Sequence, residues 1–185
     1  MEYRKLGSSD LEVSVISYGA WGIGGAPFWN NEGDGKSRDS IKKAYDLGIN
    51  FFDTAPVYGF GHSEELIGKA LKPFRDKVII ATKCGLRWDK RSLSSLRKDA
   101  SRNSILEEVD QSLKRLDMDV IDLYQVHWPD EKTDQKETME TLLEIQEKGK
   151  IRHIGVSNYS AEQVVDCLQY GKIVSLQPEF SLLAR

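Results

Sequence analysis

Short apolar runs and longer segments of helical periodicity alternate along this chain, and this alternation restricts the possible folds more than any other property of the sequence. The runs are rich in Val, Ile and Phe and are apolar on both faces, which is typical of strands buried in a parallel sheet. We predict strands at Val13–Tyr18, Asn50–Thr54, Val78–Lys83, Val120–His127, His153–Ser157 and Ile173–Gln177. The alternation predicts an α/β protein, closed either as an open doubly wound sheet or as a (β/α)8 barrel.

Five helices are expected between these strands, at Ser37–Leu47, Ser63–Leu71, Ser104–Leu116, Lys136–Lys148 and Ser160–Tyr170. Ser63 is expected to cap its helix, and Ser104 with Glu107 matches a capping box. Residues 1–13 are expected to form a β-hairpin before the repeat, since apolar residues flank the turn GSSD. Because no linker or composition shift follows, we expect a single domain over residues 1–185.

The glycines of Gly19–Gly25, which reads GAWGIGG, do not have the Gly-x-Gly-x-x-Gly spacing that joins the first strand to its helix in doubly wound dinucleotide-binding folds. A polar segment, Ala26–Lys36, follows them instead of a helix. This spacing weakens the doubly wound interpretation.

Charge and composition argue against several classes of protein. Acidic residues exceed basic ones by 29 to 26, so we expect no nucleic acid or anionic membrane as a partner. The N-terminus, MEYRK, lacks the apolar run of a signal peptide, and no stretch approaches the roughly 20 apolar residues of a membrane span. Cys84 and Cys167 form no metal or redox motif and are expected to be free thiols. We therefore expect a cytoplasmic protein without a metal site.

Polar residues close five of the predicted strands in succession. They are Asp53, Lys83, His127, Ser157 with Asn158, and Gln177. In a parallel barrel the carboxyl ends of all strands face one rim, where active sites lie. Since polar groups are costly to bury without partners, these residues indicate a site at that rim, beside Tyr58 on the loop after Asp53.

The residue types at this rim indicate proton transfer to a carbonyl oxygen. A phenol titrates near pH ~10, so Tyr58 alone is a weak acid. We expect the Lys83 ammonium to lower the pKa of Tyr58 and Asp53 to balance the charge of Lys83. With His127 orienting the carbonyl oxygen from the other side, the sequence predicts a general acid tuned towards neutral pH.

Five segments resemble successive blocks of the aldo-keto reductase family. They are NFFDTAPVYG at Asn50–Gly59, ATK at Ala81–Lys83, DLYQVHW at Asp122–Trp128, GKIRHIGVSN at Gly149–Asn158 and QPEFSLLAR at Gln177–Arg185. The resemblance covers the whole chain, is greatest to bacterial members, and extends more distantly to potassium-channel β-subunits. It implies a (β/α)8 barrel and the NADPH-dependent reduction of aldehydes and ketones to alcohols.

The resemblance also implies a role for individual residues. The catalytic tetrad would be Asp53, Tyr58, Lys83 and His127, with Tyr58 as proton donor. Residues that would bind the nicotinamide carboxamide are Ser157, Asn158 and Gln177, and those that would line its ribose are Gly19, Ala20, Trp21 and Asp53. The substrate pocket would be formed by Trp21, Tyr58, Trp88, His127 and Trp128.

Length is the main difference from that family, whose barrels have roughly 250 residues. We expect six of the eight barrel strands here, without the last two strands and without the site for the coenzyme 2′-phosphate. Open strand edges expose backbone donors and acceptors, so they need a cover. We expect the remainder of the same polypeptide to supply it, with a self-paired dimer as the alternative. The isolated chain is expected neither to close a barrel nor to turn over NADPH.

Two other functions stay open. One is a regulatory or redox-sensing subunit that holds nicotinamide without rapid turnover, as the channel β-subunits imply. His127 favours the enzyme, because the channel-associated branch commonly has Asn at this position. The other is a catalytically inactive fragment of the enzyme.

Overall fold

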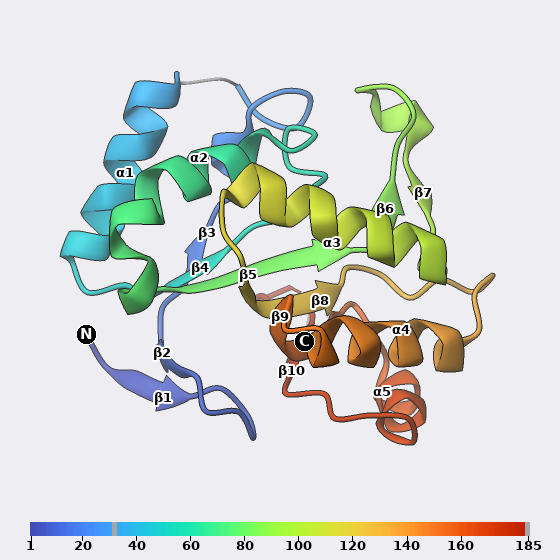
Figure 1. Cartoon of the computed structure of the whole chain (residues 1–185). Coiled ribbons are helices and arrows are strands. Elements are labelled where there is room, and N and C mark those ends of the chain that lie inside the picture. The colour runs from blue at the N-terminus through green and yellow to red at the C-terminus, as the bar shows by residue number, and fades with distance from the viewer. Residues whose placement is uncertain (31–32, 184–185) are drawn as a thin grey trace.

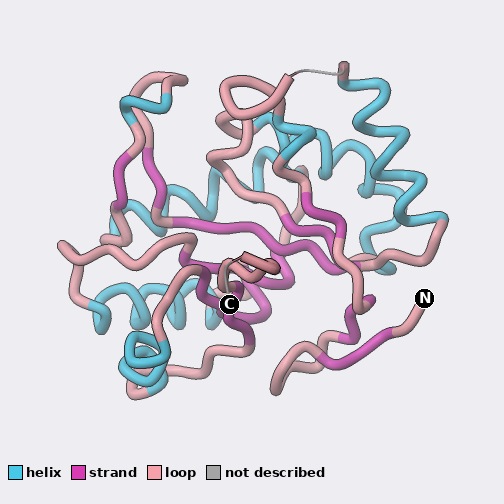
Figure 2. The backbone as a smooth tube through the Cα atoms, turned by 180° about the vertical axis from the view of Figure 1, so that it is seen from behind, coloured by secondary structure: helices cyan, strands magenta, loops and turns pink. Residues whose placement is uncertain are grey.

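A six-stranded parallel sheet with helices on one face forms the centre of the computed structural model, which describes residues 1–30 and 33–183 (Figure 1). The strands of this sheet are β3 (Tyr18–Gly19), β4 (Phe51–Asp53), β5 (Ile79–Cys84), β8 (Ile121–Val126), β9 (Ile151–Ser157) and β10 (Ser175–Gln177). The helices are α1 (Asp34–Asp46), α2 (His62–Leu71), α3 (Arg102–Leu116), α4 (Gln135–Glu147) and α5 (Ala161–Leu168). Figure 2, from the opposite side, shows the strands in front of the helices.

The order of the strands decides between the two predicted closures. Neighbours in the sheet follow one another in sequence, from β3 through β4, β5, β8 and β9 to β10, and every pair is parallel. A doubly wound sheet would reverse its order at a switch point, and this sheet does not. The fold is therefore a partial (β/α)8 barrel with six strands, as predicted.

Shorter elements lie outside the sheet. Two hairpins are formed by β1 (Tyr3–Lys5) with β2 (Glu12–Ser14) and by β6 (Leu86–Arg87) with β7 (Arg97–Lys98). Three 3₁₀ helices are η1 (Gly22–Gly24), η2 (Lys72–Lys77) and η3 (Leu93–Ser95). Of the predicted segments, Ala26–Lys36 and Gln177–Arg185 include residues 31–32 and 184–185, which lie outside the described residues.

The prediction that the strands are buried on both faces is confirmed for the central strands and is wrong for the outer ones. Every residue of β5 and β8 is buried, as their apolar sequences predict. The prediction of a buried strand is wrong for β10, where Leu176 is 42% exposed and Gln177 is exposed. The physical reason is position, because β10 and β3 are the outer strands and each has one neighbour in the described sheet.

The predicted first strand, Val13–Tyr18, is divided between two sheets. Its first part belongs to β2 of the N-terminal hairpin, and Tyr18 begins β3 of the parallel sheet. Val15 and Ile16, between the two, are exposed. The chain bends there because Ser14 donates its hydroxyl to the Ile16 carbonyl, while its backbone N–H donates to the Asn50 side chain.

Two predicted helix caps are wrong, although both helices are present. Gly61 precedes α2, and the Ser63 hydroxyl donates to the Ala20 carbonyl instead of capping the helix. Helix α3 begins earlier than predicted, after Ser101, and the Ser104 hydroxyl donates to the Glu108 carboxylate. In both cases a tertiary contact uses the hydroxyl that the local sequence assigns to a cap.

The N-terminal hairpin covers the amino ends of the strands. Leu11 and Val13 pack on Ile79 of β5, and Asp10 in the hairpin turn pairs with His153 of β9 at 2.5 Å. His153 therefore makes this contact at the amino end of the sheet, opposite to the predicted rim. Among the helices of the described residues, none is both long and apolar enough to cross a membrane.

Candidate active site

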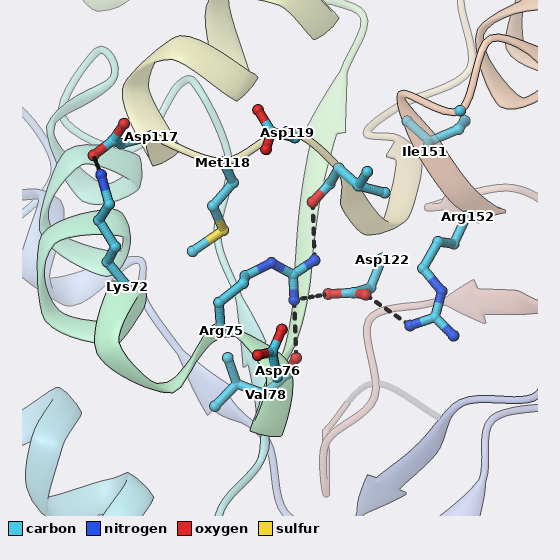
Figure 3. A pocket seen from close by; sticks show the side chains of 12 residues that line it. Lys72, Arg75, Asp76, Val78, Asp117, Met118, Asp119, Asp122, Ile151 and Arg152 are labelled. Carbon is cyan, nitrogen blue, oxygen red and sulfur yellow. Dashed lines mark hydrogen bonds and ion pairs between the residues drawn. The ribbon is translucent and has the colours of Figure 1, made fainter.

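A cavity of about 790 Å³ lies at the amino ends of β5, β8 and β9. Figure 3 shows Arg75 and Arg152 on either side of Asp122, with guanidinium–carboxylate distances of 2.8 and 2.9 Å. The buried Asp122 also accepts a hydrogen bond from the Ile80 backbone. Since these charges pair with one another and none of the predicted site residues lines the cavity, its polar groups stabilise the fold.

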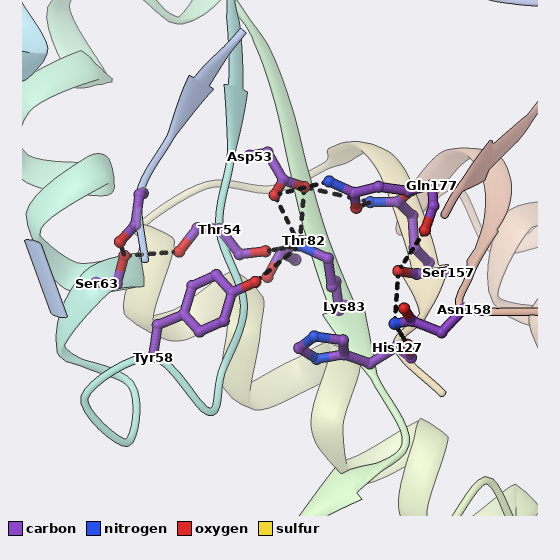
Figure 4. A network of polar contacts seen from close by, with 12 residues as sticks. Asp53, Thr54, Tyr58, Ser63, Thr82, Lys83, His127, Ser157, Asn158 and Gln177 are labelled. Atoms are coloured by element: carbon purple, nitrogen blue, oxygen red, sulfur yellow. Dashed lines mark hydrogen bonds and ion pairs between the residues drawn. The ribbon is translucent and has the colours of Figure 1, made fainter. Parts of the chain in front are cut away.

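The predicted polar residues gather at the other end of the sheet, where the strands end. Those that close a strand or lie within one residue of its end are Asp53, Lys83, His127, Ser157 and Gln177. Figure 4 shows them converging with Tyr58, which lies on the loop between β4 and α2. The four residues of the predicted tetrad are thus brought together by three adjacent strands and one loop.

A buried ion pair joins β4 to β5. Lys83 Nζ donates to Asp53 Oδ1 and Oδ2 at 2.9 and 2.8 Å, and to the Thr54 carbonyl at 2.9 Å. Burial alone would lower the pKa of Lys83, but the charge of Asp53, assisted by Tyr58, outweighs burial and raises it. Lys83 is therefore a fixed positive charge at neutral pH.

Lys83→Met is expected to destabilise a complete barrel that carries this sequence by about 3–5 kcal/mol, because it leaves the Asp53 carboxylate buried without its ion-pair partner. Denaturant unfolding at neutral pH measures the loss. Lys69→Met, at an exposed position of α2, is the matched control. A double variant with Asp53→Asn should recover part of the loss. Equal stability of Lys83→Met and wild type would contradict the ion pair.

Tyr58 points its hydroxyl at this pair. Its Oη lies 3.5 Å from Lys83 Nζ, which also lies 5.2 Å from the centre of the phenol ring. Burial is the largest influence on the pKa of Tyr58 and raises it; Lys83 lowers it, Asp53 raises it, and the net shift is upward. The predicted shift towards neutral pH is thus wrong for this structure, because burial dominates and Asp53 offsets the charge of Lys83.

His127 faces Tyr58 from the end of β8. The two ring centres are 5.9 Å apart with an interplanar angle of 83°. Burial, followed by the charge of Lys83, lowers the pKa of His127 to about 3. The imidazole is therefore neutral at physiological pH, and one of its ring nitrogens carries a hydrogen that can be donated to an oxygen between His127 and Tyr58.

The low pKa of His127 predicts a specific acid sensitivity. In the unfolded chain the imidazole binds a proton below pH ~6.5, whereas in the folded protein it stays neutral until about pH 3. Stability is therefore lost as the pH falls through this window. Between pH 7 and pH 4.5, wild type should lose about 2–3 kcal/mol more than His127→Gln in denaturant unfolding, at about 1.4 kcal/mol for each pH unit below the unfolded pKa. Parallel losses would show that His127 titrates normally in the fold.

Two glycines fix the loop that carries Tyr58. Gly59 has φ +63°, and a Cβ there would lie 2.0 Å from the Gly24 carbonyl oxygen. A Cβ on Gly24 would lie 2.7 Å from the Tyr58 carbonyl carbon. The backbones of η1 and the Tyr58 loop therefore touch directly, and side chains at either glycine would displace Tyr58.

The three residues predicted to hold a carboxamide lie together at the ends of β9 and β10. Ser157 Oγ donates to the Gln177 carbonyl at 2.9 Å. Asn158 has φ +62° and donates its side-chain amide to the His127 carbonyl at 2.9 Å. Within the described residues, Asn158 Oδ1 accepts no hydrogen bond. These groups offer both donors and acceptors beside His127, as a primary amide requires.

Gln125 is a site residue that the sequence reasoning missed. It is buried on β8, two residues before His127 and therefore on the same face of the sheet. Its amide nitrogen lies 3.3 Å from Asp53 Oδ1 and 3.4 Å from Gln177 Oε1. The available signal was a polar residue within an apolar strand, at the spacing that shares a face with His127.

The predicted ribose-lining residues at the end of β3 divide into two groups. Ala20 is fully buried, and its backbone N–H and carbonyl bond to Asp53 and Ser63, so its side chain has no surface for a ligand. Gly19 is exposed and pairs with Asp53, and Trp21 is 47% exposed. Of this segment, Gly19 and Trp21 are therefore the residues that a ligand can contact.

The three predicted substrate tryptophans differ in their distance from the chemistry. Trp21 lies closest, with its ring centre 6.1 Å from that of Tyr58. Trp128 follows His127 directly and lies under the Lys98 ammonium of β7 at 5.5 Å. Trp88 packs on Phe60, at 5.4 Å between ring centres, and Phe60 lies two residues beyond Tyr58 on the same loop.

Known proteins share this sequence pattern. The chain matches the model of the aldo/keto reductase family over residues 15–185. It is 46% identical over 187 residues to the aldo-keto reductase YhdN of Bacillus subtilis (strain 168), a match that covers 100% of this chain and 55% of that protein. It is 41% identical over 197 residues to the NADH-specific methylglyoxal reductase of Escherichia coli (strain K12), covering 100% and 60%.

A more distant relative in sequence and a solved structure also match the chain over nearly its whole length. The chain is 36% identical over 194 residues to a probable voltage-gated potassium channel subunit beta of Oryza sativa subsp. japonica, covering 100% of this chain and 57% of that protein. The structure of the glycerol dehydrogenase AKR11B4 from Gluconobacter oxydans superimposes with a TM-score of 0.90 at 39% identity, covering 99% of this chain and 56% of that one. The chain thus spans 55 to 60% of the length of the two bacterial relatives.

Proposed function

The chain belongs to the aldo/keto reductase family, and from this membership we propose that a complete barrel carrying it reduces small aldehydes and ketones to alcohols with NADPH, using Tyr58 as the proton donor. The observation that carries the proposal is the position of the Lys83 ammonium, held by Asp53 at 2.8 Å and lying 3.5 Å from the Tyr58 hydroxyl. A buried cation beside a phenol stabilises the phenolate that forms when the phenol gives up its proton.

Tyr58 acts as a general acid in this proposal. Its raised pKa keeps the phenol protonated at neutral pH, so the proton is present when a substrate binds. As the proton leaves, negative charge develops 3.5 Å from Lys83 Nζ, and the attraction grows with it. Neutral His127 donates a hydrogen bond to the same substrate oxygen and orients it towards Tyr58.

The coenzyme fits the groups beside this acid. Its carboxamide has one acceptor and one amino group, which match the amide of Gln177, the hydroxyl of Ser157 and the Oδ1 of Asn158, an atom that accepts no hydrogen bond from residues 1–30 and 33–183. Gly19, Trp21 and Asp53 would line the ribose of the nicotinamide. When bound, reduced nicotinamide supplies the hydride that the carbonyl carbon accepts.

NADPH is proposed over NADH on the family resemblance. The groups expected to hold the 2′-phosphate belong to the last two strands of a complete barrel, outside this chain. One relative is named as NADH-specific, so the assay must compare both coenzymes at equal concentration. A higher kcat/KM with NADPH supports the assignment, and a higher value with NADH reverses it.

Tryptophans would shape the substrate pocket around the acid. Trp21 is 47% and Trp128 is 42% exposed, and each follows the end of a strand that carries the site. Their rings provide apolar walls for a small carbonyl compound, with Trp88 a more remote contributor through Phe60. A panel of aldehydes of increasing size, compared by kcat/KM, tests this assignment.

We also propose that the remainder of the same polypeptide covers the open edges of the sheet. At the β10 edge, Leu176 and Phe180 are 42% and 81% exposed. A cavity of about 270 Å³ opens there, bordered by Asp53, Gln125 and Gln177. Two further strands would bury these apolar side chains and complete the wall of the site. The self-paired dimer is the competing cover.

A cytoplasmic location is proposed with this function. Cys84 and Cys167 are free and buried, and burial raises the pKa of both thiols. Buried, protonated thiols are unreactive, in agreement with a reducing compartment.

A further inference from the structure

Gln125 occupies a place that the neighbouring strand leaves open for it. It lies opposite Lys83 of β5 on one side and Gly155 of β9 on the other. A Cβ on Gly155 would lie 3.0 Å from Gln125 Cγ and 2.5 Å from Ser175 Oγ. The missing side chain at Gly155 thus provides the room in which the Gln125 amide extends along the inner face of the sheet.

Three side chains close a ring of hydrogen bonds there. Gln125 Nε2 lies 3.3 Å from Asp53 Oδ1 and 3.4 Å from Gln177 Oε1, and Gln177 Nε2 lies 3.4 Å from Asp53 Oδ2. Lys83 donates to the same two carboxylate oxygens at 2.9 and 2.8 Å. Asp53 therefore accepts four hydrogen bonds, about as many as a carboxylate can accept.

The carboxylate determines how both amides are turned. An ionised carboxylate only accepts hydrogen bonds, so both Gln125 and Gln177 must direct their amino groups towards Asp53. The amino group of Gln125 then also donates to the side-chain oxygen of Gln177, Oε1. With its oxygen engaged and one amino hydrogen on Asp53, Gln177 has its second amino hydrogen left for a ligand.

We propose that Gln125 is a positioning residue for coenzyme binding. It holds the Gln177 amide in the orientation that presents an N–H to the carboxamide oxygen of nicotinamide, and it links that amide to the Asp53–Lys83 pair. Gln125 itself does not touch the coenzyme and acts through Gln177. This inference rests on the proposed function, because it assigns the ligand of Gln177 from it.

The test is a double-mutant cycle in a complete barrel, with Gln125→Met, Gln177→Met and both together. Methionine keeps the length of the side chain and removes its amide. Each single variant should weaken NADPH binding, measured by fluorescence titration, by roughly 2- to 10-fold, the worth of one hydrogen bond. The double variant should be weakened by less than the product of the two. Tyr124→Phe, which removes a hydroxyl on the opposite face of β8, is the matched control and should bind normally.

A second cycle without coenzyme measures melting temperature for the same variants, and the ring of hydrogen bonds predicts non-additive losses there as well. Unchanged NADPH affinity in Gln125→Met, or effects that multiply in the double variant, would overturn the positioning role. A wild-type barrel that binds neither NADPH nor NADH would instead refute the proposed function and remove the ligand of Gln177. In that case the coenzyme-free cycle still shows whether the amides are coupled.

Discussion

Tyr58→Phe is expected to lower kcat for the reduction of a good aldehyde substrate by about 10²–10⁴-fold, because it removes one positioned proton donor. The dissociation constant for NADPH should change little, since Tyr58 is not among the groups assigned to the coenzyme. Steady-state kinetics gives the first quantity and fluorescence titration the second. The phenylalanine ring keeps the contacts with Trp21 and His127, so the change isolates the hydroxyl.

Tyr45→Phe provides the control for this variant. Tyr45, in the last turn of α1, stacks on Phe74 at 4.3 Å between ring centres, away from the carboxyl ends of the strands, so its hydroxyl should not affect the rate. If Tyr58→Phe kept the wild-type kcat, the assignment of Tyr58 as the acid would fail. A loss shared by Tyr45→Phe would point to a general effect on folding.

A polypeptide of these 185 residues alone is expected to show no cooperative unfolding transition and no measurable NADPH binding. Its sheet ends at β3 and β10, whose outer edges have no strand partner among the described residues. Unpaired edges expose backbone donors and acceptors and lead to association. Denaturant unfolding, size-exclusion chromatography and NADPH fluorescence measure the three consequences.

The outcomes of this experiment separate the possible covers of the sheet. If the chain aggregates or folds only in part, and adding the rest of a relative's barrel restores folding, the result supports a cover from the same polypeptide. A stable dimer would show that the edges pair with one another. A monomer with a sharp transition and micromolar NADPH affinity would contradict both and show that six strands suffice.

The central strands and the positions of the tetrad could be predicted from the sequence. Strands β5 and β8 are apolar on both faces because helices and the barrel interior bury both, and that environment is visible in the sequence. Asp53 and Lys83 could be paired before the structure was known, since parallel neighbours bring their carboxyl ends together. Membership of the aldo/keto reductase family and the partial barrel are confirmed by the comparisons.

Features that depend on tertiary context could not be predicted in this way. The hydroxyls of Ser63 and Ser104 bond to other partners, so the predicted caps do not form. The pKa of Tyr58 depends on the depth of its burial and on how Asp53 offsets Lys83, neither of which a sequence pattern contains. Gln125 was missed because its spacing from His127 places it on the same face of the strand but does not identify its partners, Asp53 and Gln177, which only the structure gives.

The number of alcohol molecules formed per NADPH oxidised decides whether this site catalyses carbonyl reduction. Purified wild-type barrel, NADPH and a small aldehyde are mixed, and the loss of reduced coenzyme and the formation of alcohol are both followed over many turnovers. A catalytic Tyr58–Lys83–Asp53 site with neutral His127 predicts one alcohol formed per NADPH oxidised, with multiple turnovers per enzyme. Tight NADPH binding with no alcohol formed from any aldehyde of the panel would contradict it and identify a coenzyme-holding regulatory subunit instead.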